Sequence, residues 1–398
     1  MVVDTQLVIG PYEAEVLGEK EILRRFTTYI ERVPTRRLLF WNTQSERYFD
    51  LVLNICEQEG IEPYLWYPVL ADRKAGQLLP GRYFSRSGAG YDGWGTGGRW
   101  EGLTGGDERF LFSCPTHGID PRQEGEQIVS LLKRFSFAGV FLDRIRYPSP
   151  ANGLEQLFSC FCPACLIAEE RAELLPLAKR AYSLLGELCA AGEALSWMEF
   201  LERAGIEDLQ RQKEEAIEDL VHEIGGSIDR SRYLIGLDLF SPSLAPLVGQ
   251  SYERLSMHCD WIKAMTYAKA EGPATLVLEC KALIDGVQSV ASHLPWEEVA
   301  TWVAQLLGFS QEALLPLEGG GSLVETLLGD EVQRAENLAV ESEVVCGIEL
   351  VDHPLFVSQI STASAQRMLE IARVHTDSVI SCWNLLYIPE ETLPLLLF

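Results

Sequence analysis

The segment GVFLDRIRYPSP, at residues 139–150, begins as an apolar run and then carries three ionisable side chains, Asp143, Arg144 and Arg146. A strand in a parallel sheet is covered on both faces, so an ionisable residue within it must be paired or functional. Active sites of (β/α)8 barrel enzymes lie where the strands reach their carboxyl ends. The segment therefore predicts a barrel strand that arrives at a functional face.

Short apolar runs rich in β-forming residues alternate with amphipathic stretches along the chain, which is the pattern of βα units around a parallel sheet. We identify eight such runs: QLVIGP from residue 6, LLFWN from 38, YLWYPV from 64, GVFLDRI from 139, YLIGLDLF from 233, WIKAMTY from 261, VVCGIELV from 344 and SVISCWNLL from 378. Between them, stretches such as PRQEGEQIVSLLKRF at 121–135 place apolar residues at helical spacing. The pattern predicts the α/β class and a (β/α)8 TIM barrel.

Two connections are too long for simple crossovers. Residues from about 150 to 230 and from about 282 to 337 are mainly helical in pattern, so we expect one barrel domain over residues 1–398 with helical insertions after strands four and six. A third long connection contains GRYFSRSGAGYDGWGTGGRW at residues 81–100. Loops longer than about 15 residues are usually functional or disordered, and we expect the aromatic residues here, Trp94 above all, to stack on a substrate.

The composition restricts the possible partners. Lys and Arg total 33 against 58 Asp and Glu, which gives a formal charge of -25. Such a charge repels phosphate backbones and anionic membranes, so we expect neither a nucleic acid nor a membrane as partner. The first residues, MVVDTQLVIG, do not resemble a signal peptide, and no stretch reaches the roughly 18 apolar residues of a membrane span. We therefore expect a cytoplasmic protein, and the sequence leaves its oligomeric state open.

Three of the expected strands carry an acid near their carboxyl ends: Asp143, Asp238 and Glu349. Each acid lies two residues after a small or apolar position of its strand, so all three side chains can point toward the barrel axis. Hydrolysis of a glycoside needs one protonated and one ionised carboxyl group, and neighbouring carboxylates drive such pKa values apart. We predict that these three acids are catalytic, with Asp143 as general acid and Glu349 as nucleophile or base.

Further side chains expected at the same level would contact a carbohydrate substrate. Lys263 and Tyr267 follow in the sixth strand, Trp383 ends the eighth, and Trp41 ends the second. Aromatic faces pack against the apolar face of a sugar ring, while the cation and the phenol can form hydrogen bonds. Arg146 fits either contact with substrate or the orientation of a carboxylate.

The stretch CPTHGIDPRQEGEQIVSLLKRFSFAGVFLDRIRYP, at 114–148, is similar to the signature of glycosyl-hydrolase-like (β/α)8 barrels from largely uncharacterised bacterial families, in which a D-G-V-x-x-D-x-I-R-Y-P strand follows a helix. Ala138 stands where those families often have an acid. WIKAMTYAKAEGP also resembles their later K-P-M-T-Y strand, with Ala264 in place of Pro. The resemblance implies a barrel that hydrolyses carbohydrate, with Asp143 as the residue that carries over best.

The wider clan of retaining glycosidases has its acid/base after strand four and its nucleophile after strand seven, which by this resemblance implies Asp143 and Glu349. That clan uses glutamates, usually with Asn before the first, whereas Leu142 precedes an aspartate here. The resemblance therefore does not establish retention of configuration. The sugar and the linkage also stay open.

Structural roles are open for the same acids. Asp143 could pair with a neighbouring arginine, Asp238 could cap the following segment, and Asp352 or His353 could replace Glu349 as the working group. Two other functions compete with hydrolysis. One is a carbohydrate-binding barrel without catalysis, and the other is a metal-dependent enzyme centred on cysteines.

Ten cysteines include the dense trio Cys160, Cys162 and Cys165 in SCFCPAC. Zinc prefers four tetrahedral ligands, so a fourth is needed, and we expect Cys114, with His117 as the second choice. A closed site of four ligands would hold structural zinc and would not activate water. In a reducing cell the same cysteines could instead be free thiols.

Overall fold

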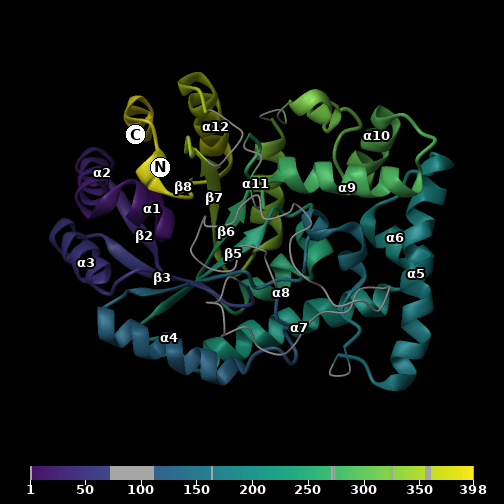
Figure 1. Ribbon diagram of the computed structural model, residues 1–398, viewed down its shortest axis with the longest axis horizontal. Coiled ribbons are helices and arrows are strands. Elements are labelled where there is room, and N and C mark those ends of the chain that lie inside the picture. The colour runs from purple at the N-terminus through teal and green to yellow at the C-terminus, as the bar shows by residue number, and fades with distance from the viewer. Residues whose placement is uncertain are drawn as a thin grey trace.

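The computed structural model describes residues 2–71, 112–162, 165–269, 272, 274–321, 323, 326–354 and 360–397. Eight parallel strands pair in chain order and close into a barrel (Figure 1). The strands are β1 (Val2–Ile9), β2 (Thr35–Asn42), β3 (Glu62–Pro68), β4 (Gly139–Asp143), β5 (Leu234–Phe240), β6 (Trp261–Met265), β7 (Glu343–Glu349) and β8 (Ser378–Cys382). The predicted α/β class and (β/α)8 barrel are confirmed, and each expected apolar run overlaps one strand.

Helices cover the outside of the barrel. They are α1 (Pro11–Val16), α2 (Gly18–Arg32), α3 (Arg47–Glu59), α4 (Pro121–Phe135), α7 (Glu207–Gly226), α8 (Tyr252–Ser256), α11 (Thr326–Leu338) and α12 (Thr362–His375). Short 3-10 helices are η1 (Pro150–Asn152), η2 (Leu154–Phe158), η3 (Ala245–Val248), η4 (Leu315–Gly320), η5 (Leu385–Tyr387) and η6 (Glu390–Leu396). Among the described residues, no helix combines the length and apolar character that a membrane crossing requires.

Two helical hairpins extend from one side of the barrel (Figure 1). Helices α5 (Ala168–Ala190) and α6 (Trp197–Ala204) follow β4, and α9 (Leu276–Val290) and α10 (Trp296–Leu306) follow β6. The hairpins pack together: a Cβ at Gly186 would lie 2.6 Å from the carbonyl oxygen of Val290. The indole of Trp302 also donates to the carbonyl of Glu193 at 2.9 Å. Helices therefore follow strands four and six, as predicted.

The helices α7 and α11 fall within the residue ranges predicted for the insertions, yet they belong to the outer ring. α7 lies beside α4, and α11 lies beside α12. A Cβ at Gly125 of α4 would come within 2.5 Å of Ser227, which shows how closely α4 and the end of α7 approach. Amphipathic stretches occur both in the insertions and in the ring, so the sequence did not separate them.

Aromatic rings fill the middle of the barrel. Trp261 stacks on Phe141 with ring centroids 5.1 Å apart, and Tyr64 meets Trp261 edge-on at 5.5 Å. A Cβ at Gly236 would lie 2.2 Å from the ring of Trp261, so this position must be glycine for the tryptophan to fit. The interior is therefore a packed core, and open space is confined to its ends.

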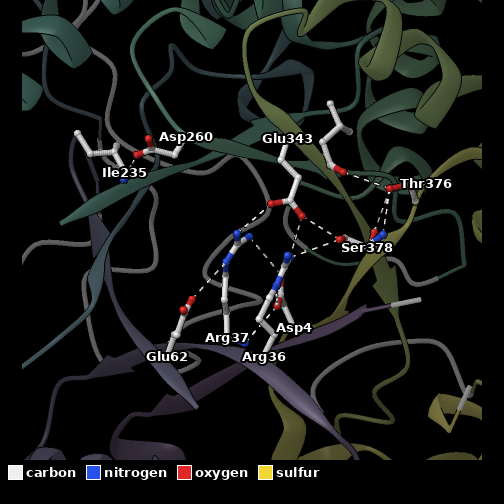
Figure 2. Close-up of polar contacts among 10 residues, drawn as sticks. Asp4, Arg36, Arg37, Glu62, Ile235, Asp260, Glu343, Thr376 and Ser378 are labelled. Carbon is white, nitrogen blue, oxygen red and sulfur yellow. Dashed lines mark hydrogen bonds and ion pairs between the residues drawn. The ribbon is translucent and has the colours of Figure 1, made fainter. Parts of the chain in front are cut away.

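A charge network occupies the amino ends of the strands (Figure 2). Arg36 contacts Asp4 and Glu343, each at 2.8 Å, and Arg37 contacts Glu343 at 2.9 Å. Burial would raise the pKa of Glu343, but Arg37 and Arg36 together lower it below its usual value. The network joins β1, β2 and β7, and it lies at the end of the barrel where residues serve stability.

Candidate active site

A cavity of about 80 Å³, within about 730 Å³ of space that includes open solvent, lies at the carboxyl ends of the strands. Every one of the eight strands, or the segment directly after it, contributes a side chain. Seven residues predicted from the sequence line it: Trp41, Asp143, Arg146, Asp238, Lys263, Tyr267 and Trp383. The structure thus brings most of the predicted site together. Trp94 lies outside the described residues.

Asp143 ends β4, and its carboxylate accepts two short hydrogen bonds and also pairs with the neighbouring Arg144, whose Nε lies 3.5 Å from Oδ2. The indole Nε1 of Trp66 donates to its Oδ2 at 2.9 Å, and the amide of Arg144 donates to its Oδ1 at 2.6 Å. Arg144 has a φ of 57°, which is unusual for a residue other than glycine. Burial raises the pKa of Asp143, although the Trp66 hydrogen bond and the charge of Lys263 oppose this.

Asp238 and Lys263 form a buried pair on neighbouring strands. They are register partners in β5 and β6, and Nζ of Lys263 lies 3.0 Å from Oδ2 of Asp238. Lys263 also donates to Oε1 of Gln6 at 3.2 Å. Burial raises the pKa of Asp238 to about 7; Lys263 lowers it in part, and the nearby Asp143 charge raises it further. Oδ1 of Asp238 is buried and has no hydrogen-bond partner among the described residues.

Gly347 provides the space that Lys263 and Tyr267 occupy. A Cβ at this position would lie 3.3 Å from Cε of Lys263 and 3.0 Å from Cε1 of Tyr267. The ammonium of Lys263 lies 5.3 Å from the centre of the Tyr267 ring, a distance at which a cation and a ring attract. Positions that share a strand face with the predicted acids therefore do point into the barrel.

Tryptophans form the walls of the cavity. Trp41 and Trp66 lie with their ring centroids 5.5 Å apart, and the guanidinium of Arg144 lies 5.5 Å from the centre of the Trp41 ring. On the other side, Trp383 lies 6.1 Å from the imidazole of His353. Sequence reasoning missed Trp66, because it lies in an apolar run where a tryptophan normally indicates core.

A second polar cluster lies where the barrel closes. Glu13, at the start of α1, accepts hydrogen bonds from the amide of Gly10 at 2.9 Å and from Nδ2 of Asn384 at 3.3 Å. Nε2 of His353 lies 3.8 Å from the same carboxylate. Glu13, His353 and Asn384 all line the cavity. Glu13 and Asn384 were missed, although Glu13 follows the first predicted run by two residues and Asn384 lies near the end of the last one. These positions are the signal that could have found them.

Glu349 and Arg146 have different surroundings. Glu349 is buried at the end of β7, its Oε1 accepts the amide of Lys269, and it is not among the residues that line the cavity. Arg146 lies between two rings, with its guanidinium 4.4 Å from the centre of Phe112 and 4.5 Å from that of Phe240. The predicted acids Asp143 and Asp238 therefore line one cavity, and Glu349 is buried outside the set of residues that line it.

The four predicted cysteines also come together, away from the cavity. The sulfur atoms of Cys114, Cys160, Cys162 and Cys165 all lie within 4.8 Å of one another. None of the four lines the cavity, and His117, the second choice, is exposed. The site with carboxyl groups and the cluster of thiols are thus separate features.

The chain is similar to known proteins in its fold. No family model and no curated protein matches the chain. Among solved structures it resembles the glycoside hydrolase domain of PgaB (BpsB) from Bordetella bronchiseptica, with 11% identity, a TM-score of 0.55, and coverage of 99% of this chain and 98% of that one. It also resembles a class V chitinase from Pseudomonas fluorescens Pf-5, with 10% identity, a TM-score of 0.50, and coverage of 99% and 98%.

A third similar structure is β-galactosidase from the psychrophilic Marinomonas ef1, with 10% identity and a TM-score of 0.53. The match covers 96% of this chain and 54% of that one. All three structures carry names of glycoside hydrolases, and identities this low show the fold only. The resemblance to glycosyl-hydrolase-like barrels, expected from residues 114–148, is confirmed at that level.

Proposed function

We propose that the protein is a glycoside hydrolase that cleaves an oligo- or polysaccharide in the cavity at the carboxyl ends of the strands. One observation carries this proposal: Asp143 and Asp238, two buried carboxyl groups with raised pKa values, line one cavity walled by tryptophans. Glycoside hydrolysis requires such a pair of carboxyl groups with one proton between them. The likeness to glycoside hydrolase folds supports the same class of reaction.

The pair can divide the two tasks of the reaction. Burial raises the pKa of Asp238 to about 7, and the charge of Asp143 contributes to this rise. In the proposed mechanism Asp238 therefore gives its proton to the leaving glycosidic oxygen. Asp143, which accepts hydrogen bonds from Trp66 and from the amide of Arg144, acts as the ionised partner, either attacking the anomeric carbon or taking a proton from water.

The other residues that line the cavity are suited to bind a sugar. The faces of Trp41, Trp66 and Trp383 can stack on sugar rings, and Lys263 can donate to hydroxyl groups. The formal charge of -25 disfavours anionic polysaccharides. We therefore propose neutral or cationic substrates. Chitin oligosaccharides and β-galactosides come first, because similar structures are named a chitinase and a β-galactosidase.

The two competing functions predict different behaviour. A metal-dependent enzyme centred on the cysteines is disfavoured because none of the four thiols lines the cavity. We assign that cluster a structural role. A carbohydrate-binding barrel would bind the same sugars through its tryptophans but release no product.

The test is hydrolysis of a panel of chitin oligosaccharides, partially deacetylated chitin, β-galactosides and neutral glucans by the wild type. On a confirmed substrate, Asp143→Asn and Asp238→Asn should each lower kcat/KM by at least about 100-fold, because the amide cannot transfer a proton. The matched control is Asp260→Asn, which changes a carboxylate at the opposite end of the barrel, where it contacts Arg230 and the amide of Ile235. This control should keep the wild-type rate.

The same experiment decides the role of Glu349. If it is the nucleophile or base, as the resemblance implied, Glu349→Gln will be as inactive as Asp143→Asn, and Asp238→Asn will retain activity. Wild-type rates in both aspartate variants would refute the proposed pair. Tight binding of a sugar with no turnover on any substrate would instead indicate a binding protein.

A further inference from the structure

We propose that Cys114, Cys160, Cys162 and Cys165 form a structural zinc site, and that it fastens the segment before α4 to the connection that follows β4. This site is separate from the cavity described above. It would hold one divalent ion between four thiolates. The argument rests on sulfur distances, on the turns that present the cysteines, and on burial.

The distances between sulfur atoms suit one tetrahedral ion. Sγ of Cys114 lies 3.8 Å from Sγ of Cys162 and 3.2 Å from Sγ of Cys165. Zinc–sulfur bonds of about 2.3 Å in a tetrahedron place the sulfur atoms about 3.8 Å apart. A disulfide would need about 2.05 Å, and all four cysteines are free thiols. A multi-iron cluster would hold its cysteine sulfurs farther apart than a single ion does.

Two tight turns present the cysteines to one point. The amides of Cys165 and Leu166 both donate to the carbonyl of Cys162 at 3.1 Å, and the amide of Gly118 donates to the carbonyl of Cys114 at 2.7 Å. A Cβ at Gly118 would lie 2.6 Å from the nitrogen of Cys114, so the second turn needs glycine. The protein chain itself therefore preforms both halves of the site.

Burial and hydrogen bonding favour a closed site. Cys114 is 0% exposed, and Cys160 and Cys162 are each 3% exposed. The amide of Cys162 donates to Sγ of Cys160 at 3.4 Å, and such a bond stabilises a thiolate. Cys165 is partly exposed. Four thiolates this close together would require a compensating cation, which zinc supplies. With four protein ligands there is no open position for water, so the ion would be structural and not catalytic.

The site would also stiffen one wall of the cavity. Phe112 lies two residues before Cys114, and its ring packs against the guanidinium of Arg146, which lines the cavity. On the other side, Cys165 lies close to the start of α5. Zinc would thus anchor the base of the first helical hairpin to the segment that carries Phe112.

The test is elemental analysis of protein purified without chelator and without a metal-binding tag. We expect about one zinc per chain in the wild type, and loss of zinc in Cys114→Ser and Cys162→Ser. The matched control is Cys189→Ser, which makes the same change at a buried cysteine in α5 outside the cluster. This control should keep its zinc.

Two measurements on the wild type cover the case in which the serine variants do not fold. Removal of zinc by a strong chelator should expose four reactive thiols and lower the Tm, and zinc added back should restore both. Replacement by Co²⁺ should give the visible absorption of a tetrahedral site with four thiolates. The proposal is overturned if the wild type is metal-free and its Tm does not respond to zinc. Iron in place of zinc, or zinc that persists in both cluster variants, also overturns it.

Discussion

Burial and hydrogen bonding act in opposite directions on the carboxyl group of Asp143. Burial raises its pKa, whereas the indole of Trp66 and the amide of Arg144 stabilise the ionised form. The balance leaves a carboxyl group that holds a proton more readily than an exposed aspartate. Trp66 is therefore a positioning residue as well as a wall of the cavity.

Trp66→Phe removes the indole donor and keeps an aromatic face. Since the hydrogen bond from Trp66 lowers the pKa of Asp143, its loss should raise that pKa further. The pH profile of kcat/KM on a confirmed substrate reports this shift as a displacement of the limb that belongs to Asp143. Trp41→Phe is the control, because Trp41 lines the same cavity without being the donor to Asp143. An equal displacement in both variants would argue against a specific role of the indole.

The strands and helices differ in how well the sequence predicts their limits. The helix over 121–135 matches α4 residue for residue, because Asp120 caps its first turn and the apolar spacing is regular. The first strand was predicted from residue 6, yet β1 begins at Val2. Polar side chains at its start looked unsuited to a buried strand. Their partners come from distant strands: Asp4 meets Arg36, and Thr5 meets Ser381.

Gly186 controls the packing of the two helical hairpins. Gly186→Ala places a Cβ 2.6 Å from the carbonyl of Val290, so α5 must move away from α9. We expect a loss of about 1–3 kcal/mol in the free energy of unfolding, as for other overpacked contacts. Urea unfolding measures it, together with limited proteolysis of the hairpins. Gly226→Ala in α7 is the matched control, because nothing lies within 4 Å of the added Cβ, and it should be neutral or slightly stabilising. Equal stability of the two variants would mean that the hairpins adjust without cost.

In the candidate site, too, some residues could be predicted from the sequence and others could not. The acids Asp143 and Asp238 could be predicted because a charge inside an apolar strand is visible in the sequence. The contact between Glu13 and Asn384 could not be predicted, because these residues meet only when the first and last strands of the barrel pair. Sequence patterns report the order of elements along the chain, whereas closure of the barrel decides which distant loops become neighbours.

Asp238 should also make the stability of the whole protein depend on pH. Its pKa rises from an ordinary value of 3.8 to about 7 on folding, so between these values the folded state binds more protons than the unfolded state. The free energy of unfolding therefore falls as pH rises through this window, and the contribution of Asp238 is complete only below pH 3.8. The variant Asp238→Asn lacks this dependence. Between pH 4 and pH 7 its free energy of unfolding should therefore rise relative to that of the wild type. Urea unfolding at several pH values tests this, with Asp260→Asn as control, and a constant difference across the window would contradict it.

The charge network at the amino ends of the strands has a consequence for synthesis on the ribosome. Arg37 emerges early, and its partner Glu343 follows 306 positions later. Until β7 is made, Arg36 and Arg37 both lack Glu343, and β1 lacks its neighbour β8. The barrel of the growing chain therefore stays open between β1 and β8 for most of its translation. We expect resistance to protease to arise in one late step, when the last two strands are made and Glu343 can pair with the two arginines.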